Sequence, residues 1–477
     1  ANRTQHTYVL ERSDLDLVTI TFHKARRESP ALRMRRLLCA LALLVVSAAA
    51  SAAPSACAHA LSARAPAVRR SAIAAMLRSD EQWMAHALQL AERGRRTAPP
   101  NPWVGSVIVA ADGATILGEG YHVCAGGPHA EAAALADACA RGVSSEALAG
   151  ATIYVTLEPC HAGPGKRTPA CDEAIVAAGI RRVVLALLDP DPIFGGAGLK
   201  WLRSRGVAVE VGAGGAAAAA SLEPYLHQRR TKRPFCVLKT ALSIDGAVAC
   251  EDGSSRWITG PEARADAHRI RAYSQAVIVG AGTALRDEPR LTWRAEGGEA
   301  WARADADGAP APQPLRVVLD TNGRLLGGPL LDTAEAPTLV LTSAELCDPD
   351  ALRAWDRAGV EHEVVPLATL AGAGAGCGGA RGLHLPAVLD ALGRRGILQA
   401  MWEGGPHLHA SLLQQDLADE LVVYVGNCLL GSSALPWAQG PLARTIGEKR
   451  EWALRSCEAL GQDVRITYAR RPKPGTD

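Results

Sequence analysis

The sequence of 477 residues lacks several features that would by themselves assign it to a class of proteins. Its net charge is only +2, and no long block of lysine and arginine occurs after residue 80. The charge distribution therefore does not support a nucleic-acid-binding surface, because such a surface is rich in lysine and arginine. The twelve cysteines lack the dense, regular spacing of a disulfide scaffold. These absences favour a small-molecule substrate and a reducing compartment.

Acidic residues are absent between Met34 and Asp80. After Met34, two arginines precede an apolar run and then small residues at 37–53, which is the layout of a secretory signal peptide. The apolar run is shorter than the roughly 20 residues that span a bilayer, so we expect no membrane partner for the mature protein. Residues 54–79 are rich in Ala, Ser and Arg, like a transit peptide. Segment 1–79 is thus predicted to be a targeting or upstream segment, and its part after Met34 is predicted to direct the protein to a plastid. The alternative is a cytoplasmic protein whose N-terminus has no targeting role.

Strand-like runs alternate with helix-like segments after residue 80, and this alternation predicts an α/β domain. A Gly/Ala tract at 212–220 and a basic stretch at 227–233 break the pattern, and a second alternation follows. We therefore predict two α/β domains, 80–228 and 229–477. The predicted strands are 104–110, 151–157, 182–188 and 207–211 in the first domain, and 237–240, 276–279, 315–320, 338–342 and 396–402 in the second.

A histidine, a glutamate and two cysteines occur in the order expected of a zinc site. His129 and Glu131 stand where a helix should begin, so both side chains can project from its first turn. Cys160 follows a proline after a predicted strand, and Cys171 opens the next predicted helix. This order is the ligand pattern of zinc-dependent nucleobase deaminases. The sequence therefore predicts a zinc ion held by His129, Cys160 and Cys171.

The chemistry of such a site accounts for each residue type. One imidazole and two thiolates hold zinc tetrahedrally and leave one position for water, whose pKa the metal lowers toward neutrality. Glu131, two positions from His129, can carry a proton from that water to departing ammonia. The alternative is a structural zinc site, which usually has four protein ligands; the nearby candidates for a fourth are His122, Cys124 and His161. We predict hydrolytic removal of an amino group from a pyrimidine-like ring.

Further motifs resemble the deaminase domain of bifunctional riboflavin-biosynthesis enzymes, and the resemblance covers residues 82–470. It implies an N-terminal cytidine-deaminase-like domain with three α/β/α layers. In that family, a diaminopyrimidinone ribosylamino 5′-phosphate is deaminated, and its ribose is then reduced to ribityl with NADPH. The resemblance implies that Asn101 contacts the pyrimidine and that Lys166 or Arg167 meets the phosphate. The matching motifs lie at 100–105, 118–122, 128–131, 156–160, 168–171 and 189–192.

One loop departs from the pattern of that family. Ten residues separate Cys160 from Cys171, two more than usual, and Ala170 stands where a proline is usual. An insertion can bulge outward without moving its ends. It could also shift Cys171 or bring His161 to the metal, so the geometry of this loop stays open.

Two glycine-containing turns follow apolar strands in the second predicted domain. Residues 280–283 read Gly-Ala-Gly-Thr, and residues 403–406 read Glu-Gly-Gly-Pro and lead into a predicted helix at 407–413. Glycines there let backbone amides approach a phosphate, whose negative charge the helix dipole favours. Each turn alone has an ordinary structural explanation. No G-x-G-x-x-G fingerprint follows an early strand, so a standard Rossmann domain is not supported.

Together these segments resemble the reductase domain of the same family, which has a dihydrofolate-reductase-like α/β fold. The matching segments lie at 239–246, 253–259, 282–294 and 403–405. The resemblance implies NADPH as the cofactor, and it implies that Arg294 meets the substrate phosphate, a role that suits its guanidinium. Small departures are Glu288 in place of an aspartate and Trp293 in place of a small aliphatic residue. The residues expected to contact substrate are Ser255, Leu291, Arg294 and Glu403, and those expected to contact NADPH are Ala241, Trp257, Thr283, Asp287, Gly405, Pro406 and His407.

The reductase half needs no metal, because it must only hold the nicotinamide against the ring-opened ribose and supply a proton as hydride arrives. Asp287 or Glu403 could orient the sugar hydroxyls. The sequence does not identify the proton donor.

Other classes of protein share parts of this pattern. Transfer-RNA adenosine deaminases have the same histidine, glutamate and cysteine types, but their two cysteines lie three positions apart and they lack a second α/β domain. A non-catalytic descendant would be expected to have lost ligands, and here all are present. A third alternative is that only one of the two domains is active. The deaminase would then be the inactive one, because it contains the lengthened loop. We predict a bifunctional enzyme with zinc and NADPH that acts on a phosphorylated ribosylaminopyrimidine and not on nucleic acid; the oligomeric state, monomer or homo-oligomer, stays open.

Overall fold

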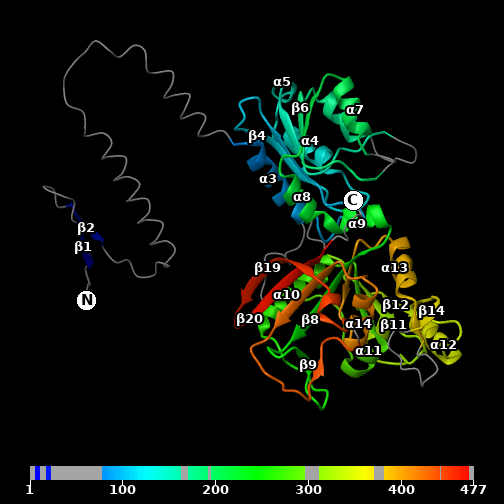
Figure 1. Cartoon of the computed structure of the whole chain (residues 1–477). Helices are drawn as coiled ribbons and strands as arrows, with labels where there is room; N and C mark the ends of the chain where they lie inside the picture. The colour runs from blue at the N-terminus through cyan, green and yellow to red at the C-terminus, as the bar shows by residue number, and fades with distance from the viewer. Residues whose placement is uncertain are drawn as a thin grey trace, which may run out of the picture. The chain divides into compact units, whose positions relative to one another are not determined.

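Two separate β-sheets carry the two halves of the chain (Figure 1). Spatial contacts divide the chain into the units Ala1–Ala75 and Met76–Asp477. In the first unit, strands β1 (His6–Leu10) and β2 (Val18–Phe22) form an antiparallel pair. The computed structural model describes residues 6–10, 18–22, 78–162, 170–191, 195–295, 311–369, 381–440 and 442–471.

The segment with the composition of a signal and transit peptide, from residue 34 to residue 77, lies outside the described residues. Within the described ranges, none of the helices combines the length and the apolar character that crossing a bilayer requires.

The first sheet has five strands in the order β4-β3-β5-β6-β7. Strand β3 pairs antiparallel with both β4 and β5, whereas β5, β6 and β7 are parallel. The helix before β3 begins at a capping box, in which Ser79 and Gln82 bond each other's backbone amides. The elements are α3 (Asp80–Arg93), β3 (Gly105–Val109), β4 (Ile116–Tyr121), α4 (Ala130–Ala140), α5 (Ser145–Leu148), β5 (Thr152–Val155), α6 (Cys171–Ala177), β6 (Arg182–Leu185), α7 (Ala197–Ser204), β7 (Ala208–Val211), α8 (Gly215–Ser221) and α9 (Glu223–Thr231).

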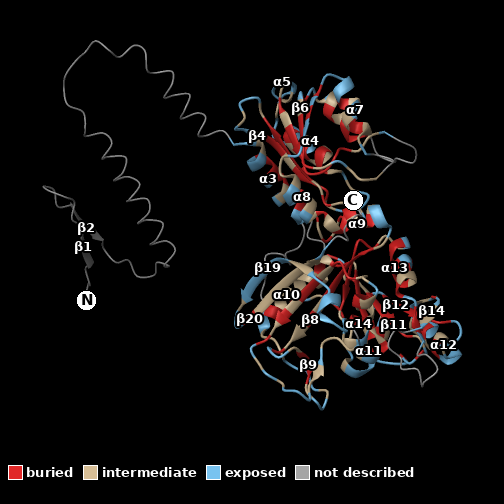
Figure 2. Cartoon of the chain, viewed as in Figure 1, coloured by how far each residue is buried: buried red, intermediate tan, exposed pale blue. Residues whose placement is uncertain are grey.

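Helices cover both faces of this sheet because its side chains alternate between them. Ile108 and Val183 lie in one apolar cluster with residues of α4, α6 and α7. Their neighbours Val107 and Val184 lie in another cluster, with residues of α3 and α8. The central strands are accordingly buried along most of their length (Figure 2). This confirms the predicted three-layer α/β/α arrangement.

The second sheet has nine strands in the order β13-β12-β11-β10-β16-β8-β17-β20-β19. All strand pairs from β13 to β17 are parallel, and the pairs β17-β20 and β20-β19 are antiparallel. The elements are β8 (Phe235–Leu242), β9 (Ala247–Ala249), α10 (Pro261–Tyr273), β10 (Ala276–Gly280), α11 (Ala281–Asp287), β11 (Leu315–Leu319), η2 (Pro329–Leu331), β12 (Thr338–Thr342), α12 (Pro349–Ala358), β13 (Glu361–Val364), β14 (Leu367–Thr369), β15 (Arg381–Leu383), α13 (Leu385–Arg394), β16 (Gln399–Trp402), α14 (Pro406–Gln414), β17 (Glu420–Val425), β18 (Leu435–Pro436), η3 (Ile446–Glu448), β19 (Trp452–Leu460) and β20 (Asp463–Arg470).

This sheet is also covered on both faces. Ile278 and Val317 lie in a cluster with residues of α13 and α14. Val277 and Val318, the neighbours of those residues, lie in a cluster with residues of α11 and α12. The two-domain α/β prediction is therefore confirmed.

Two features of the fold were not predicted from the sequence. The Gly/Ala tract and the basic stretch, where the alternation was expected to break, lie mostly in two successive helices, α8 and α9, between β7 and β8; alanine has the highest helix propensity, which outweighs the glycines. The prediction also ended the strands of the second domain at residue 402, and so missed β17, β19 and β20. Strand β19 is mostly exposed, and Arg455, Ser456 and Glu458 interrupt its apolar residues.

Replacing Trp355 by alanine is expected to destabilise the second domain by about 3–5 kcal/mol, the usual cost of removing a buried aromatic side chain. Trp355 is 0% exposed, and its Nε1 donates a hydrogen bond of 2.7 Å to the Leu325 carbonyl oxygen. Urea unfolding followed by far-UV circular dichroism measures the change. The control Leu346→Ala removes a side chain that is 41% exposed and should shift stability by no more than about 0.5 kcal/mol. Equal unfolding midpoints for the two variants would contradict this packing.

Candidate functional site

Three side chains from separate segments meet at one end of the first sheet. His129 immediately precedes α4, Cys160 follows β5 through a short loop, and Cys171 is the first residue of α6. Their potential ligand atoms all lie within 4.8 Å of one another, and no other such metal-binding group occurs among the residues that the structure describes. His129 Nδ1 lies 3.2 Å from the Cys160 sulfur and 3.5 Å from the Cys171 sulfur.

These distances fit a zinc ion. Tetrahedral zinc with a nitrogen at about 2.0 Å and a sulfur at about 2.3 Å separates the two ligand atoms by about 3.5 Å. The observed separations are close to this value, and one imidazole with two thiols is a donor set that zinc prefers. Three protein ligands leave one coordination position for a reactant, which is typical of a catalytic zinc site.

Glu131 lies beside this group in the first turn of α4 and is only 3% exposed. Burial, reinforced by the nearby Cys160 thiolate, raises the pKa of Glu131 to about 7. A carboxyl group with a pKa near neutrality can both accept and donate a proton at physiological pH.

Asn101 is held in place by His122. From the sequence alone, His122 was considered only as a possible fourth zinc ligand. His122 Nδ1 lies 2.8 Å from the Pro128 carbonyl oxygen, to which it must donate its proton. His122 Nε2 therefore accepts the hydrogen bond of 3.1 Å from the Asn101 side-chain amide. Burial lowers the pKa of His122 and so favours this neutral form. Lys166, predicted to meet the substrate phosphate, lies outside the described residues.

Two buried carboxylates hold the segments on either side of the lengthened loop. Glu158 accepts hydrogen bonds from the backbone amides of Gly196 and Leu199, at 3.0 and 3.3 Å. Asp172 is 0% exposed, and its Oδ2 lies 2.5 Å from His161 Nδ1. His161 is therefore engaged with Asp172 and is not part of the zinc-binding group.

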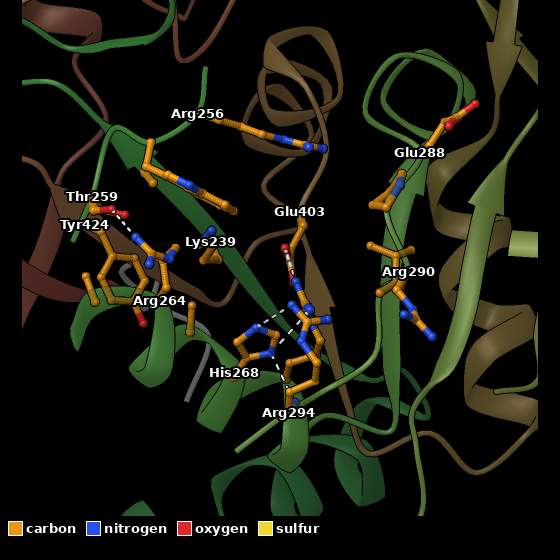
Figure 3. A pocket seen from close by; sticks show the side chains of 17 residues that line it. Lys239, Arg256, Thr259, Arg264, His268, Glu288, Arg290, Arg294, Glu403 and Tyr424 are labelled. Carbon is orange, nitrogen blue, oxygen red and sulfur yellow. Dashed lines mark hydrogen bonds and ion pairs between the residues drawn. The ribbon is translucent and has the colours of Figure 1, made fainter. Parts of the chain in front are cut away.

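A cavity of about 620 Å³ lies in the second domain (Figure 3). Six of its lining residues are lysine or arginine, whereas only Glu288 and Glu403 are acidic, so the cavity suits an anionic ligand. The lining residues are Lys239, Ala241, Arg256, Trp257, Thr259, Ala263, Arg264, Ala267, His268, Arg271, Glu288, Pro289, Arg290, Leu291, Arg294, Glu403 and Tyr424.

Five of the residues predicted for the reductase site line this cavity: Ala241, Trp257, Leu291, Arg294 and Glu403. Trp257 is 70% exposed, and the Arg264 guanidinium lies over its ring, 4.5 Å from the ring centre. The other predicted residues, which do not line the cavity, are Ser255, Thr283, Asp287, Gly405, Pro406 and His407.

Thr283 and Gly405 nevertheless face each other. Strands β10 and β16 are parallel neighbours, so the turns after them meet at one edge of the sheet. A Cβ atom on Gly405 would lie 3.5 Å from Thr283 Oγ1. Gly405 also precedes α14, and a helix N-terminus stabilises a phosphate group.

Glu403 is paired with Arg271, a residue that the sequence-based prediction missed. Arg271 Nε and Nη2 each donate a hydrogen bond of 2.9 Å to one carboxylate oxygen of Glu403, and Nη1 donates to the Thr292 carbonyl oxygen. Burial opposes ionisation, but the positive charges of Arg271 and Lys239 prevail and lower the pKa of Glu403 to about 2. Glu403 is therefore a fixed carboxylate. Arg271 belongs to no sequence motif. The one feature of the sequence that could have pointed to it is its position three residues after His268, which places both residues on the same face of a helix.

Comparison with known proteins identifies both domains. The family model described as "RibD C-terminal domain" matches residues 234–466, and the model described as "Cytidine and deoxycytidylate deaminase zinc-binding region" matches residues 77–187.

Relatives and solved structures match along most of the chain. The riboflavin biosynthesis protein RibD of Chlamydia pneumoniae is 38% identical over 395 residues, which are 82% of this chain and 96% of that protein. RibD of Escherichia coli is 37% identical over 387 residues, 81% of this chain and 98% of that protein. The structure of Acinetobacter baumannii RibD, form 2, matches with a TM-score of 0.68 and 33% identity, over 82% of this chain and 98% of that one.

Replacing Cys171 by alanine is expected to reduce bound zinc from about one ion per chain to a small fraction of that, because two ligands hold the ion far less tightly than three. Atomic emission on the dialysed protein measures the zinc content. Two control variants, Cys139→Ala and His161→Ala, should keep their zinc, since Cys139 is exposed and His161 is bound to Asp172. Full zinc content in Cys171→Ala would show that other residues hold the ion.

Proposed function

The chain belongs to the RibD family of riboflavin biosynthesis proteins, and from this membership we propose the substrate and the residue roles of its two reactions. It is a bifunctional enzyme, with a zinc-binding deaminase domain and a reductase domain that uses NADPH. We propose the domain limits 80–228 and 229–477. A solved relative from Thermotoga maritima, 30% identical with a TM-score of 0.68 over 82% of this chain and 99% of that one, is described as a diaminohydroxyphosphoribosylaminopyrimidine deaminase and 5-amino-6-(5-phosphoribosylamino)uracil reductase.

The proposed first reaction is deamination of 2,5-diamino-6-ribosylamino-4(3H)-pyrimidinone 5′-phosphate. His129, Cys160 and Cys171 hold zinc, which when bound lowers the pKa of a water molecule toward neutrality. Glu131 accepts a proton from the attacking water and gives it to the amino group, so that a C=O bond replaces the C–N bond and ammonia leaves. Asn101, oriented by His122, contacts the pyrimidine ring, and Lys166 meets the phosphate.

The proposed second reaction reduces the ribosyl group of the deaminated product to ribityl. NADPH supplies the hydride, which adds to C1′ of the ring-opened ribose, and a proton is taken up. Glu403, held ionised by Arg271, accepts hydrogen bonds from the sugar hydroxyls, and Arg294 contacts the phosphate. Ser255 and Leu291 complete the proposed substrate contacts. The proposed NADPH contacts are Ala241, Trp257, Thr283, Asp287, Gly405, Pro406 and His407.

One observation carries the deaminase assignment. Glu131, 3% exposed and with its pKa raised to about 7, lies beside three ligand atoms that fit zinc. A purely structural zinc site has no use for such an acid, because its ligands satisfy the metal without one.

Glu131→Gln is expected to lower ammonia release from the diaminopyrimidinone phosphate by about 10²- to 10⁴-fold, the usual contribution of general acid-base catalysis. The wild-type protein should release ammonia without NADPH and form the ribityl product only when NADPH is added. Ammonia release and NADPH oxidation are followed separately by absorbance.

The matched control uses the same variant and the already deaminated substrate. Glu131→Gln should reduce that compound at the wild-type rate, because the cavity that contains Glu403 and Arg294 is unchanged. Wild-type ammonia release by the variant would refute the role of Glu131. Deamination of transfer RNA in place of the pyrimidine would refute the proposed substrate.

For location, we propose that segment 1–79 directs the protein to a plastid bounded by extra membranes, and that its partners there are small molecules and neither nucleic acid nor membrane. A homo-oligomer is compatible with this proposal. A fluorescent protein fused to residues 1–79 should enter the plastid of an alga with such a plastid, whereas a fusion to residues 54–79, which lack the signal-peptide layout, should stay in the cytosol. Cytosolic fluorescence from the longer fusion, seen by microscopy, would contradict plastid targeting.

A further inference from the structure

Trp257 forms an exposed aromatic wall of the reductase cavity. It is 70% exposed and lines the cavity, and Arg264 Cζ lies 4.5 Å from the centre of its ring. Arg264 therefore covers one face of the indole. Because so much of Trp257 is exposed in spite of this contact, the opposite face of the ring is open to a ligand in the cavity.

Arg264 is fixed by the start of helix α10. The chain runs from Trp257 through Thr259 into this helix, and Arg264 lies in its first turn. Arg264 Nη1 donates a hydrogen bond of 2.9 Å to the Thr259 carbonyl oxygen, drawn as a dashed line in Figure 3. The backbone amide of Gly260 donates a hydrogen bond of 2.6 Å to the buried Asp463 carboxylate. The guanidinium and the backbone beside Trp257 are thus held by the same short segment.

No carboxylate competes with the indole for the guanidinium of Arg264. Within the described ranges, Arg264 forms no ion pair, and its contacts are the Thr259 carbonyl oxygen and the Trp257 ring. A guanidinium over an indole is attracted by the negative charge of the ring face, and its plane can stack on the ring while its N–H groups donate. An ammonium group has no such plane, so lysine would reproduce the charge without the stacking.

An indole that is already held on one face can bind a flat ligand on its other face at a lower entropic cost. A freely moving tryptophan has to be ordered when the ligand binds, and this ordering weakens binding. The contact with Arg264 orders the ring before the ligand arrives. NADPH carries flat rings, and Trp257 is one of the proposed NADPH contacts.

We propose that Arg264 is a positioning residue of the reductase, which fixes the Trp257 indole as the wall against which a flat ring of NADPH packs. This proposal rests on the proposed function, in which Trp257 contacts NADPH. It gives Arg264 no direct contact with the cofactor. It therefore differs from a role in which the positive charge of Arg264 binds a phosphate group in this basic cavity.

A double-mutant cycle with NADPH as the varied substrate tests the proposal. Arg264→Met should raise the KM for NADPH by about 2- to 30-fold, the range of a cation–π contact. The kcat and the KM for the deaminated ribosylaminopyrimidine phosphate should change far less. Trp257→Ala should also raise the KM for NADPH, and in that background Arg264→Met should have no further effect, because the ring that it positions is gone.

The matched control is Arg205→Met in the first domain. Arg205 lies over the Trp201 ring at 5.0 Å, so it makes the same kind of contact, but neither residue lines the cavity. This variant should keep the wild-type KM for NADPH. Urea unfolding shows whether each variant is folded. If Arg264→Met does not fold, Arg264→Lys replaces it in the cycle; it should raise the KM less, and its effect should also vanish without Trp257.

The results that would overturn the proposal are distinct from those that would overturn the proposed function. An equal rise in KM from the Arg264 variant with and without Trp257 would show that Arg264 acts on the cofactor directly, and an unchanged KM would show that it is not needed. Either result refutes the positioning role. If Trp257→Ala leaves the KM for NADPH unchanged, the proposed contact of Trp257 is wrong. If the wild-type protein oxidises no NADPH, the proposed reductase reaction is wrong. In both of these cases the role of Arg264 fails as well.

Discussion

The common direction of particular strands is the constraint on which both sites depend. In the second sheet, β8, β10 and β16 are neighbours and run in the same direction, so the segments that follow them reach the same edge. This brings Thr283 close to Gly405, although the two residues are far apart in sequence. In the first sheet, β4 and β5 both pair antiparallel with β3 and therefore run in the same direction, so the segments after them bring His129 and Cys160 together. Residues that are distant in sequence thus meet because the strands before them run in the same direction.

The pKa values of the buried glutamates in the two sites are shifted in opposite directions. Burial, together with the charge of Cys160, raises the pKa of Glu131 to about 7, so the group can exchange a proton. Glu403 is also buried, but the fork of Arg271 keeps it ionised. One carboxyl group is thereby suited to moving protons and the other to holding hydroxyl groups. The difference comes from the neighbouring charges, which are the cations Arg271 and Lys239 beside Glu403 and the Cys160 sulfur beside Glu131.

The sequence was sufficient for the zinc group and insufficient for the residues that support it. His129, Glu131, Cys160 and Cys171 stand at helix starts and strand ends, positions that local patterns reveal. His122 acts through its contact with Asn101, which is distant in sequence, and no local spacing shows how an imidazole ring is oriented. The helices α8 and α9 were missed for a different reason, since a Gly/Ala tract is ambiguous until its packing is known. The sequence also did not show whether the loop insertion brings His161 to the metal. The position of His161 is set by its contact with the Asp172 carboxylate, which is visible only in the structure.

The carboxylates of Glu158 and Asp172 have a consequence for how this enzyme can vary. They fasten the chain just before Cys160 and just after Cys171, through bonds to α7 and to His161. The ends of the intervening stretch are therefore set independently of its length, and a few added residues cost little chain entropy. The stretch is a natural place at which relatives can gain or lose residues while the metal ligands keep their spacing. It is equally a place where a peptide label could be inserted without loss of zinc.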